Sequence, residues 1–164
     1  MSSMMRMLKS SSVCLTVFLS IGLAAEAAAK TCDLSIEGND AMQFNAKELS
    51  VGKDCTEVKL TLKHSGKLPK SAMGHNWVLT SEKDMAAVVT AGMSAGLAAD
   101  YLPKGDAKVI ASTKLVGGGE SATVTFKTAG LKAGEAYKFF CTFPGHSAIM
   151  NGSFSIKDGP TAGG

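Results

Sequence analysis

Three residue types that bind soft metal ions stand close together near the C-terminal end of the chain. Cys141, His146 and Met150 follow the spacing Cys-x4-His-x3-Met. Far upstream, His75 follows Gly74 and supplies a second imidazole. One thiolate, two imidazoles and a weak thioether form the ligand set of a blue-copper electron-transfer site. The short motif alone could arise by chance, but together with the upstream Gly-His pair it predicts one type 1 copper ion.

This ligand set suits a metal that changes its oxidation state. Cu(I) favours soft sulfur and Cu(II) favours nitrogen, so a mixed trigonal set with a weak axial thioether is acceptable to both. Structural zinc is the main competitor, but zinc prefers closed sites of Cys and His, and a thioether is a poor zinc ligand. A hydrolytic site is disfavoured, because no acid–base pair stands near the motif and four protein ligands leave no clear position for water.

The N-terminal end predicts an export signal, residues 1–29. Arg6 and Lys9 form a short positive region, residues 13–25 are mostly apolar and uncharged, and residues 27–29 offer an A-x-A cleavage site. The apolar run is shorter than the roughly 20 residues that span a bilayer. We therefore expect cleavage near Ala29 and Lys30, and no stable membrane association.

The remaining chain predicts one domain, residues 30–157, followed by a loose Gly/Pro-rich tail, residues 158–164. Losing Arg6, Lys9 and Glu26 with the leader lowers the formal net charge from +3 to +2. The remaining lysines are scattered among acidic residues and few aromatics lie between them. This pattern is typical of solvated faces, so we do not expect nucleic-acid binding.

The cysteine count predicts one disulfide and one remaining thiol. Cys32, Cys55 and Cys141 remain after the leader, and an odd number in an exported protein leaves one thiol over. Cys32 and Cys55 lie near the ends of two expected early strands, so we pair them. The bridge closes a loop of about 23 residues, worth roughly 3 kcal/mol in the chain-entropy model. Burial as a small hydrophobe is the alternative to metal ligation for Cys141.

Short segments with alternating polarity predict a β-sandwich. Period-two alternation and turn-bounded runs give expected strands over residues 33–37, 43–51, 57–64, 76–80, 121–127, 136–141 and 152–157. Residues 81–91 break this pattern, with Ser81 as a possible N-cap and Glu82 and Asp84 in the first turn. We expect one short helix there, followed by a Gly- and Ala-rich flap that extends to Asp100.

The chain resembles the azurins, a family of bacterial periplasmic cupredoxins. The resemblance covers about residues 32–157 and is carried by residues 39–40, 42–45, 68–70, 84–85 and 100–102, by MGHNWVL at 73–79 and by FFCTFPGHSA at 139–148. It implies an all-β, eight-stranded Greek-key sandwich, cupredoxin-like, with a short helix and flap insertion. It also implies a type 1 copper, the Cys32–Cys55 bridge and a periplasmic location.

The resemblance also implies contacts that spacing does not show. The Gly74 carbonyl would lie opposite Met150 as a second weak axial ligand. The backbone N–H groups of Asn76 and Phe143 would reach the Cys141 sulfur and help set the reduction potential. An apolar patch would surround the exposed edge of His146, and such a patch suits a transient redox encounter. Its members are Met42, Met73, Met93, Phe143, Pro144 and Ala148, and ordinary packing is the alternative for Met42 and Met93.

Two other residues invite a functional interpretation. His64 ends an alternating segment and could be a pH-sensitive group, as the resemblance suggests. A hydrogen-bonded histidine without a role in transfer is the alternative, and Ser65 follows it where the family often has proline. We expect Trp77 to be a core residue rather than an electron relay.

Together these patterns predict a monomeric electron carrier that is not an enzyme, with c-type cytochromes or copper nitrite reductase among the partners that the resemblance suggests. Copper storage or delivery is the alternative function. It is disfavoured because four of the nine methionines lie in the leader, which leaves no Met-rich tract. A non-redox exported sandwich domain would leave the Cys-His-Met set unexplained.

Overall fold

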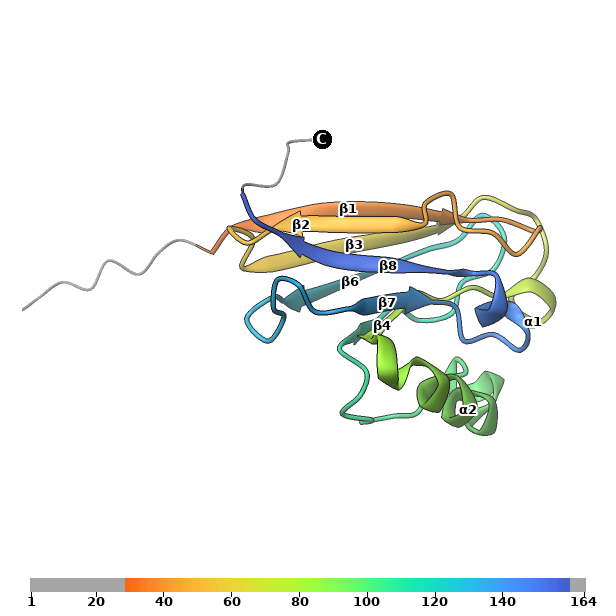
Figure 1. The fold of residues 1–164 in the computed structure, drawn as a ribbon. Helices are drawn as coiled ribbons and strands as arrows, with labels where there is room; N and C mark the ends of the chain where they lie inside the picture. Colours follow the sequence, from red (N-terminus) through yellow and green to blue (C-terminus); the bar gives the residue numbers. More distant parts are fainter. Residues whose placement is uncertain (1–28, 160–164) are drawn as a thin grey trace, which may run out of the picture.

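The structure is a computed structural model that describes residues 29–159 (Figure 1). The leader and the greater part of the tail fall outside this range. Cleavage near Ala29 and Lys30 therefore stays a prediction, as does the looseness of residues 158–164.

Eight strands form two sheets that pack face to face (Figure 1). The three-stranded sheet has the order β1-β3-β6 and the five-stranded sheet the order β2-β8-β7-β4-β5. The strands are β1 (Thr31–Gly38), β2 (Glu48–Gly52), β3 (Glu57–His64), β4 (Val78–Ser81), β5 (Ala111–Ser112), β6 (Ser121–Lys127), β7 (Tyr137–Phe140) and β8 (Asn151–Lys157). The helices are α1 (Lys70–Met73) and α2 (Met85–Ala95), and 3-10 turns cover Glu82–Asp84, Leu97–Ala99 and His146–Ala148. The predicted all-β sandwich with a short helix insertion is confirmed.

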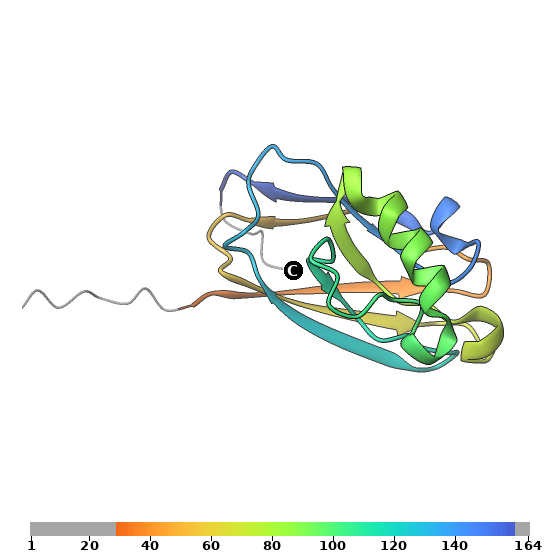
Figure 2. The ribbon, with the colours of Figure 1, turned by 90° about the horizontal axis from the view of Figure 1, so that it is seen from below.

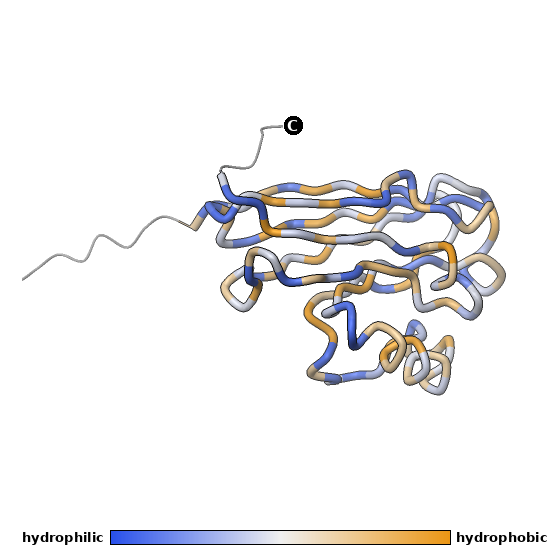
Figure 3. The backbone as a smooth tube through the Cα atoms, in the orientation of Figure 1, coloured by the Kyte–Doolittle hydropathy of each residue, from blue (hydrophilic) through white to orange (hydrophobic). Residues whose placement is uncertain are grey.

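Strand β3 shows why the alternating segments become strands. Val58, Leu60 and Leu62 are fully buried, while Lys59 and Lys63 face solvent. The hydropathy along the backbone changes with the same period (Figure 3). Because successive side chains of a strand point to opposite faces, this pattern places one face of β3 in the core. The same period carries His64, the last residue of the strand, to the inner face.

Aromatic rings fill the space between the two sheets. Trp77 is fully buried, and its ring lies 5.9 Å from Phe126 and 6.1 Å from Phe139. The indole Nε1 of Trp77 is buried and has no hydrogen-bond partner among the described residues. Packing rather than hydrogen bonding therefore holds this ring, in agreement with its predicted place in the core.

Helix α2 lies beside β4, at the edge of the sandwich away from β1 and β2 (Figures 1 and 2). Val78 of β4 and Phe140 of β7 form a second buried cluster with Val88 of α2. Strand β4 is therefore covered on both faces, which explains why Val78, Leu79 and Thr80 are all buried. This burial also explains why residues 76–80 show no polar alternation in the sequence.

The structure differs from the predicted elements at several places. Residues 43–47 form no regular strand and hold only the bridge between Phe44 and Gly38. The Asn39 side chain accepts the N–H groups of Ala41 and Gln43, and this local turn competes with strand pairing. Helix α2 begins at Met85 rather than Ser81, because residues 82–84 form a 3-10 turn.

The Ser81 hydroxyl accordingly does not cap the helix. It donates to the Asp84 carboxylate at 2.6 Å instead. Helix α1 and strand β5 were not predicted; with four and two residues, they are too short to show a period in the sequence.

The predicted disulfide joins Cys32 and Cys55, and Cys141 is a buried free thiol. Cys32 lies at the start of β1, whereas Gly38 at the other end of this strand lies against His75. Six residues of strand separate the two positions, which corresponds to about 20 Å. The bridge therefore ties the chain at the end of the sandwich away from His75.

Because the bridge and His75 lie far apart, we expect that removing the disulfide lowers the stability of the fold and leaves the site around His75 unchanged. Replacing both Cys32 and Cys55 with alanine should lower the free energy of unfolding by about 3 kcal/mol, because the unfolded chain gains freedom. Urea unfolding of the metal-free protein measures this loss. The visible spectrum of the copper-loaded variant should remain that of the unaltered protein. A changed spectrum would show that the two ends are coupled.

Candidate metal centre

Three buried ligand groups from separate parts of the chain converge at one end of the sandwich. The ligand atoms of His75, Cys141 and His146 all lie within 4.8 Å of one another. A two-way backbone pairing with Val116 holds His75, with N–O distances of 2.9 and 2.8 Å. Cys141 directly follows β7, and His146 opens the 3-10 turn after Gly145, whose φ of +81° requires glycine-like freedom.

One nitrogen of the His75 ring forms a hydrogen bond, and the other has no hydrogen-bond partner among the described residues. Nε2 lies 2.9 Å from the carbonyl oxygen of Asn39, and a carbonyl can only accept, so Nε2 carries the proton. Nδ1 is buried and has no hydrogen-bond partner among residues 29–159. Burial is the main cause that lowers the pKa of His75, which favours the neutral ring. A neutral imidazole with a buried, unpartnered lone pair fits a metal ligand.

Cys141 offers a thiol that is shielded from water. Its Sγ lies 3.6 Å from Nδ1 of His146 and 3.8 Å from the carbonyl oxygen of Gly74. Burial raises the pKa of this thiol to about 12, and backbone N–H groups of Asn76 and Phe143 partly oppose the rise. The metal-free protein therefore holds a protonated thiol at neutral pH, and a bound metal must displace that proton. These are the two N–H groups that the resemblance names, and their effect on the reduction potential stays a prediction.

His146 is neutral over most of the pH range for the same main reason as His75. Burial, with smaller contributions from the nearby rings of His75 and His64, lowers its pKa to about 4. Its backbone N–H donates to the Phe143 carbonyl at 3.0 Å, which holds the loop curled. The ring of Phe143 lies 4.5 Å from the imidazole. An imidazole in this setting is available to a metal at neutral pH.

Met150 and Gly74 complete the predicted group. Met150 is fully buried, and its carbonyl accepts the N–H of Cys141 at 3.0 Å. A Cβ atom added to Gly38 would lie 2.7 Å from Cδ2 of His75 and 3.3 Å from Cε of Met150. Both ligand side chains therefore pack against the bare backbone of Gly38. The structure thus places Gly74 beside Cys141 and Met150 near His75, and the roles of Gly74 and Met150 as ligands stay a prediction.

A buried amide links two of the segments that carry ligands. The Asn76 side chain donates to the Thr142 hydroxyl at 2.7 Å and to the Asp100 carbonyl at 2.9 Å. Its oxygen accepts the Thr142 N–H at 2.8 Å. Sequence reasoning missed Thr142 and the carbonyls of Asn39 and Asp100. In the sequence Asn39 stands out only among the residues that carry the resemblance, and a carbonyl leaves no signal because every residue has one.

His64 stacks on His75 and is not itself a ligand. The two rings lie 4.3 Å apart and are nearly parallel. Nε2 of His64 bonds the Met73 carbonyl at 2.8 Å, and Nδ1 accepts the Gly66 N–H at 3.0 Å. Both nitrogens have partners in the neutral ring, so the structure supports a hydrogen-bonded histidine that buttresses His75.

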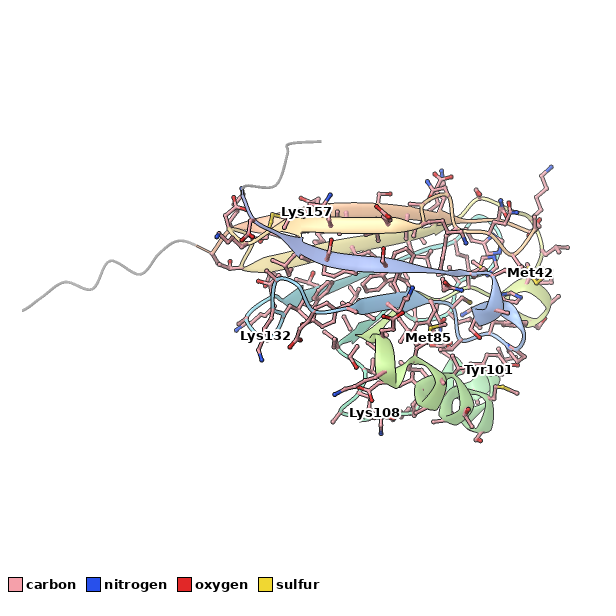
Figure 4. The ribbon with its side chains drawn as sticks, viewed as in Figure 1. Met42, Met85, Tyr101, Lys108, Lys132 and Lys157 are labelled. Atoms are coloured by element: carbon pink, nitrogen blue, oxygen red, sulfur yellow. A yellow bond between two sulfur atoms is a disulfide. The ribbon has the colours of Figure 1, made fainter. Side chains whose placement is uncertain are left out.

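The residues of the apolar patch differ in exposure. Met93 on α2 is 55% exposed, Pro144 and Ala148 are exposed, and Met42, Met73 and Phe143 are half-buried. His146 itself is only 2% exposed. Figure 4 shows Met42 and Tyr101 at the end of the sandwich that carries α1, opposite Lys132 and Lys157. The Tyr101 ring lies 5.2 Å from Phe143, which in turn contacts His146.

Comparison with known proteins agrees with this geometry. Residues 30–157 match the family model of copper binding proteins, plastocyanin/azurin family. The chain belongs to this family. Azurin from Pseudomonas aeruginosa is 53% identical over 135 residues, 82% of this chain and 91% of that protein. Azurin from Achromobacter denitrificans is 55% identical over 130 residues, 79% and 87% of the two chains. Azurin from Alcaligenes faecalis is 56% identical over 125 residues, which cover 76% of this chain and 98% of that protein.

Family membership and the converging side chains identify the metal as copper and the protein as a copper electron-transfer protein. Zinc, the competitor on chemical grounds, is set aside by the family. Within residues 29–159, no helix is long and apolar enough to cross a membrane.

The lowered pKa of His146 predicts how the metal-free protein responds to acid. The pKa rises from about 4 in the folded protein to its ordinary 6.5 on unfolding. Between these values the unfolded chain binds more protons, so stability is lost as the pH falls from 6.5 towards 4. The loss through His146 alone should reach roughly 3 kcal/mol, measured by urea unfolding across this range. His146→Gln should remove about this much of the pH dependence of the free energy of unfolding. An equally steep dependence in this variant would contradict the lowered pKa of His146.

Proposed function

We propose that this protein is a periplasmic electron carrier in which His75, Cys141 and His146 form the trigonal ligands of one type 1 copper. The Met150 thioether and the Gly74 carbonyl are proposed as the weak axial ligands. The buried and unpartnered Nδ1 of His75, within 4.8 Å of a free thiol and a second neutral imidazole, carries this proposal. When bound, copper supplies a one-electron couple between Cu(II) and Cu(I).

The chain's part is to keep the ligands still while the charge of the site changes. Hydrogen bonds fix the ring of His75 to Asn39, and the Asn76 amide to Thr142. The chain of Cys141 is bonded to that of Met150. A metal held by preorganised ligands needs little rearrangement when an electron arrives or leaves. The buried site also excludes water, so no open position remains for hydrolysis, and we assign no catalytic residue.

We further propose that electrons enter and leave through His146. This residue stands in the chain between Pro144 and Ala148, which are both exposed. The narrow exposed edge of its ring is enough for electron transfer, which needs proximity rather than substrate access. The apolar patch gives partners a surface to meet briefly without strong binding.

The exported location and the partners belong to the same proposal. The predicted leader would deliver the chain to the periplasm, where the Cys32–Cys55 bridge persists. The named azurins and the family description suggest redox partners in general. We propose c-type cytochromes or copper nitrite reductase as partners and a monomer as the carrier.

Replacing Cys141 with serine tests the copper assignment. The blue colour of the copper-loaded protein should disappear, because serine cannot supply the thiolate to which copper binds. Visible absorption after adding Cu(II), before and after a reductant, measures this. The unaltered protein should be intensely blue and bleach reversibly. Colourless copper binding by the unaltered protein would point to storage, and no binding would reject a copper site.

A charge placed on the patch tests the route of the electron. Met93→Glu should slow electron self-exchange by roughly tenfold, because two like charges meet when two patches approach. Line broadening in NMR spectra of mixed oxidised and reduced protein measures the rate. Thr125→Glu, on the exposed outer face of β6, is the control with the same change in charge. Equal rates in the two variants would reject the patch as the route.

A further inference from the structure

Lys47 links the turn that carries Met150 to a strand distant in sequence. Lys47 directly precedes β2, and its backbone carbonyl accepts the Ser153 N–H of β8 at 2.9 Å. The next residue, Glu48, pairs with Ser153 in the parallel β2–β8 ladder. The backbone of Lys47 is thus anchored beside the start of β8. This strand follows directly after the turn that carries Met150, residues 146–150, which we call the Met150 turn.

The side chain of Lys47 reaches back over this turn. Its Nζ lies 2.7 Å from the carbonyl oxygen of Ile149 and 3.4 Å from that of Asn151. These two carbonyls flank Met150, whose own carbonyl accepts the N–H of Cys141. The carbonyls of Ile149, Met150 and Asn151 therefore all accept hydrogen bonds, and the Lys47 ammonium group donates two of them. Among the described residues no carboxylate pairs with Lys47, so these carbonyls are its polar partners.

The other bonds of the turn are local. The N–H groups of Ile149 and Met150 both donate to the His146 carbonyl, at 3.0 and 2.7 Å. The Asn151 side chain donates to the Ser147 carbonyl at 2.9 Å. These bonds shape the turn without tying it to β2. The Lys47 ammonium group joins the turn to the residue that precedes β2. Its hydrogen bonds are charge-assisted, and such bonds are stronger than those between neutral groups.

We propose that Lys47 is a positioning residue for the axial ligand, holding the Met150 turn at a fixed distance from the rest of the site. This proposal rests on the proposed function, in which Met150 is the weak axial ligand. A weak axial bond is easily stretched, so its length depends on what holds the turn. Because the axial ligand tunes the potential of such a site, Lys47 would tune it through Met150. The positive charge would act separately, by disfavouring the higher oxidation state, so the loss of this charge alone lowers the potential.

Hydrogen exchange in the metal-free protein tests the tie without any redox chemistry. In Lys47→Met, the amides of Ile149 and Met150 should exchange roughly fivefold faster or more, because the turn opens more easily without its tie. Lys47→Arg keeps a charged donor and should restore protection. Lys127→Met, which removes an exposed lysine of β6, is the control and should change neither amide. Equal protection in Lys47→Met and Lys127→Met would overturn the proposal.

The copper-loaded protein separates positioning from simple charge. Lys47→Met should lower the reduction potential and also change the copper hyperfine splitting in the EPR spectrum, which reports the axial geometry. Lys47→Arg should restore both. A lowered potential with an unchanged EPR spectrum would mean that only charge is felt, and would overturn positioning. An unaltered protein without a blue, reducible copper would instead reject the proposed function, while leaving the exchange result as a separate test of the tie.

Discussion

A buried lone pair without a hydrogen-bond partner is the constraint on which this structure depends. Nδ1 of His75 points into a site that also holds a protonated thiol and a second neutral imidazole. Leaving a buried polar group unsatisfied costs about 1–3 kcal/mol, so the metal-free fold carries this cost. A metal ion removes it by accepting the lone pair. Metal binding and folding stability are therefore coupled, with the thiol proton as the group that must leave.

The rest of the site fixes which atoms are free to bind. The Asn39 carbonyl selects the tautomer of His75 by accepting a hydrogen bond from its Nε2–H, so that Nδ1 remains for the metal. Gly38 lets His75 and Met150 pack against bare backbone, and a side chain there would collide with the His75 ring. The Asn76 amide joins the segments before β4 and after β7. Each of these contacts needs the finished sandwich, because the partners lie far apart in the sequence.

The sequence predicted the ligands better than it predicted what holds them. Cys141, His146 and Met150 are recognisable because their side chains are scarce and chemically distinct. Strand β3 is recognisable because one of its faces is exposed to solvent, so its sequence alternates in polarity. Strand β4 shows no alternation since α2 covers its outer face, and β2 begins late because Asn39 forms a local turn. The carbonyls of Asn39 and Asp100 could not be predicted, because a carbonyl differs from its neighbours only by position.

Two demands on this site conflict, and the arrangement of the loop reconciles them. Ligands that must keep their places through a change of charge need a dry and rigid setting, which the burial of Cys141, His75 and Met150 provides. An electron carrier must nevertheless bring its metal close to another protein. His146 lies in the same loop as the exposed residues Pro144 and Ala148 and is itself 2% exposed. A ligand that stands between exposed loop residues can serve both demands, because an electron crosses a few ångströms of protein where water and larger molecules cannot. Helix α2 also carries an exposed apolar side chain, Met93.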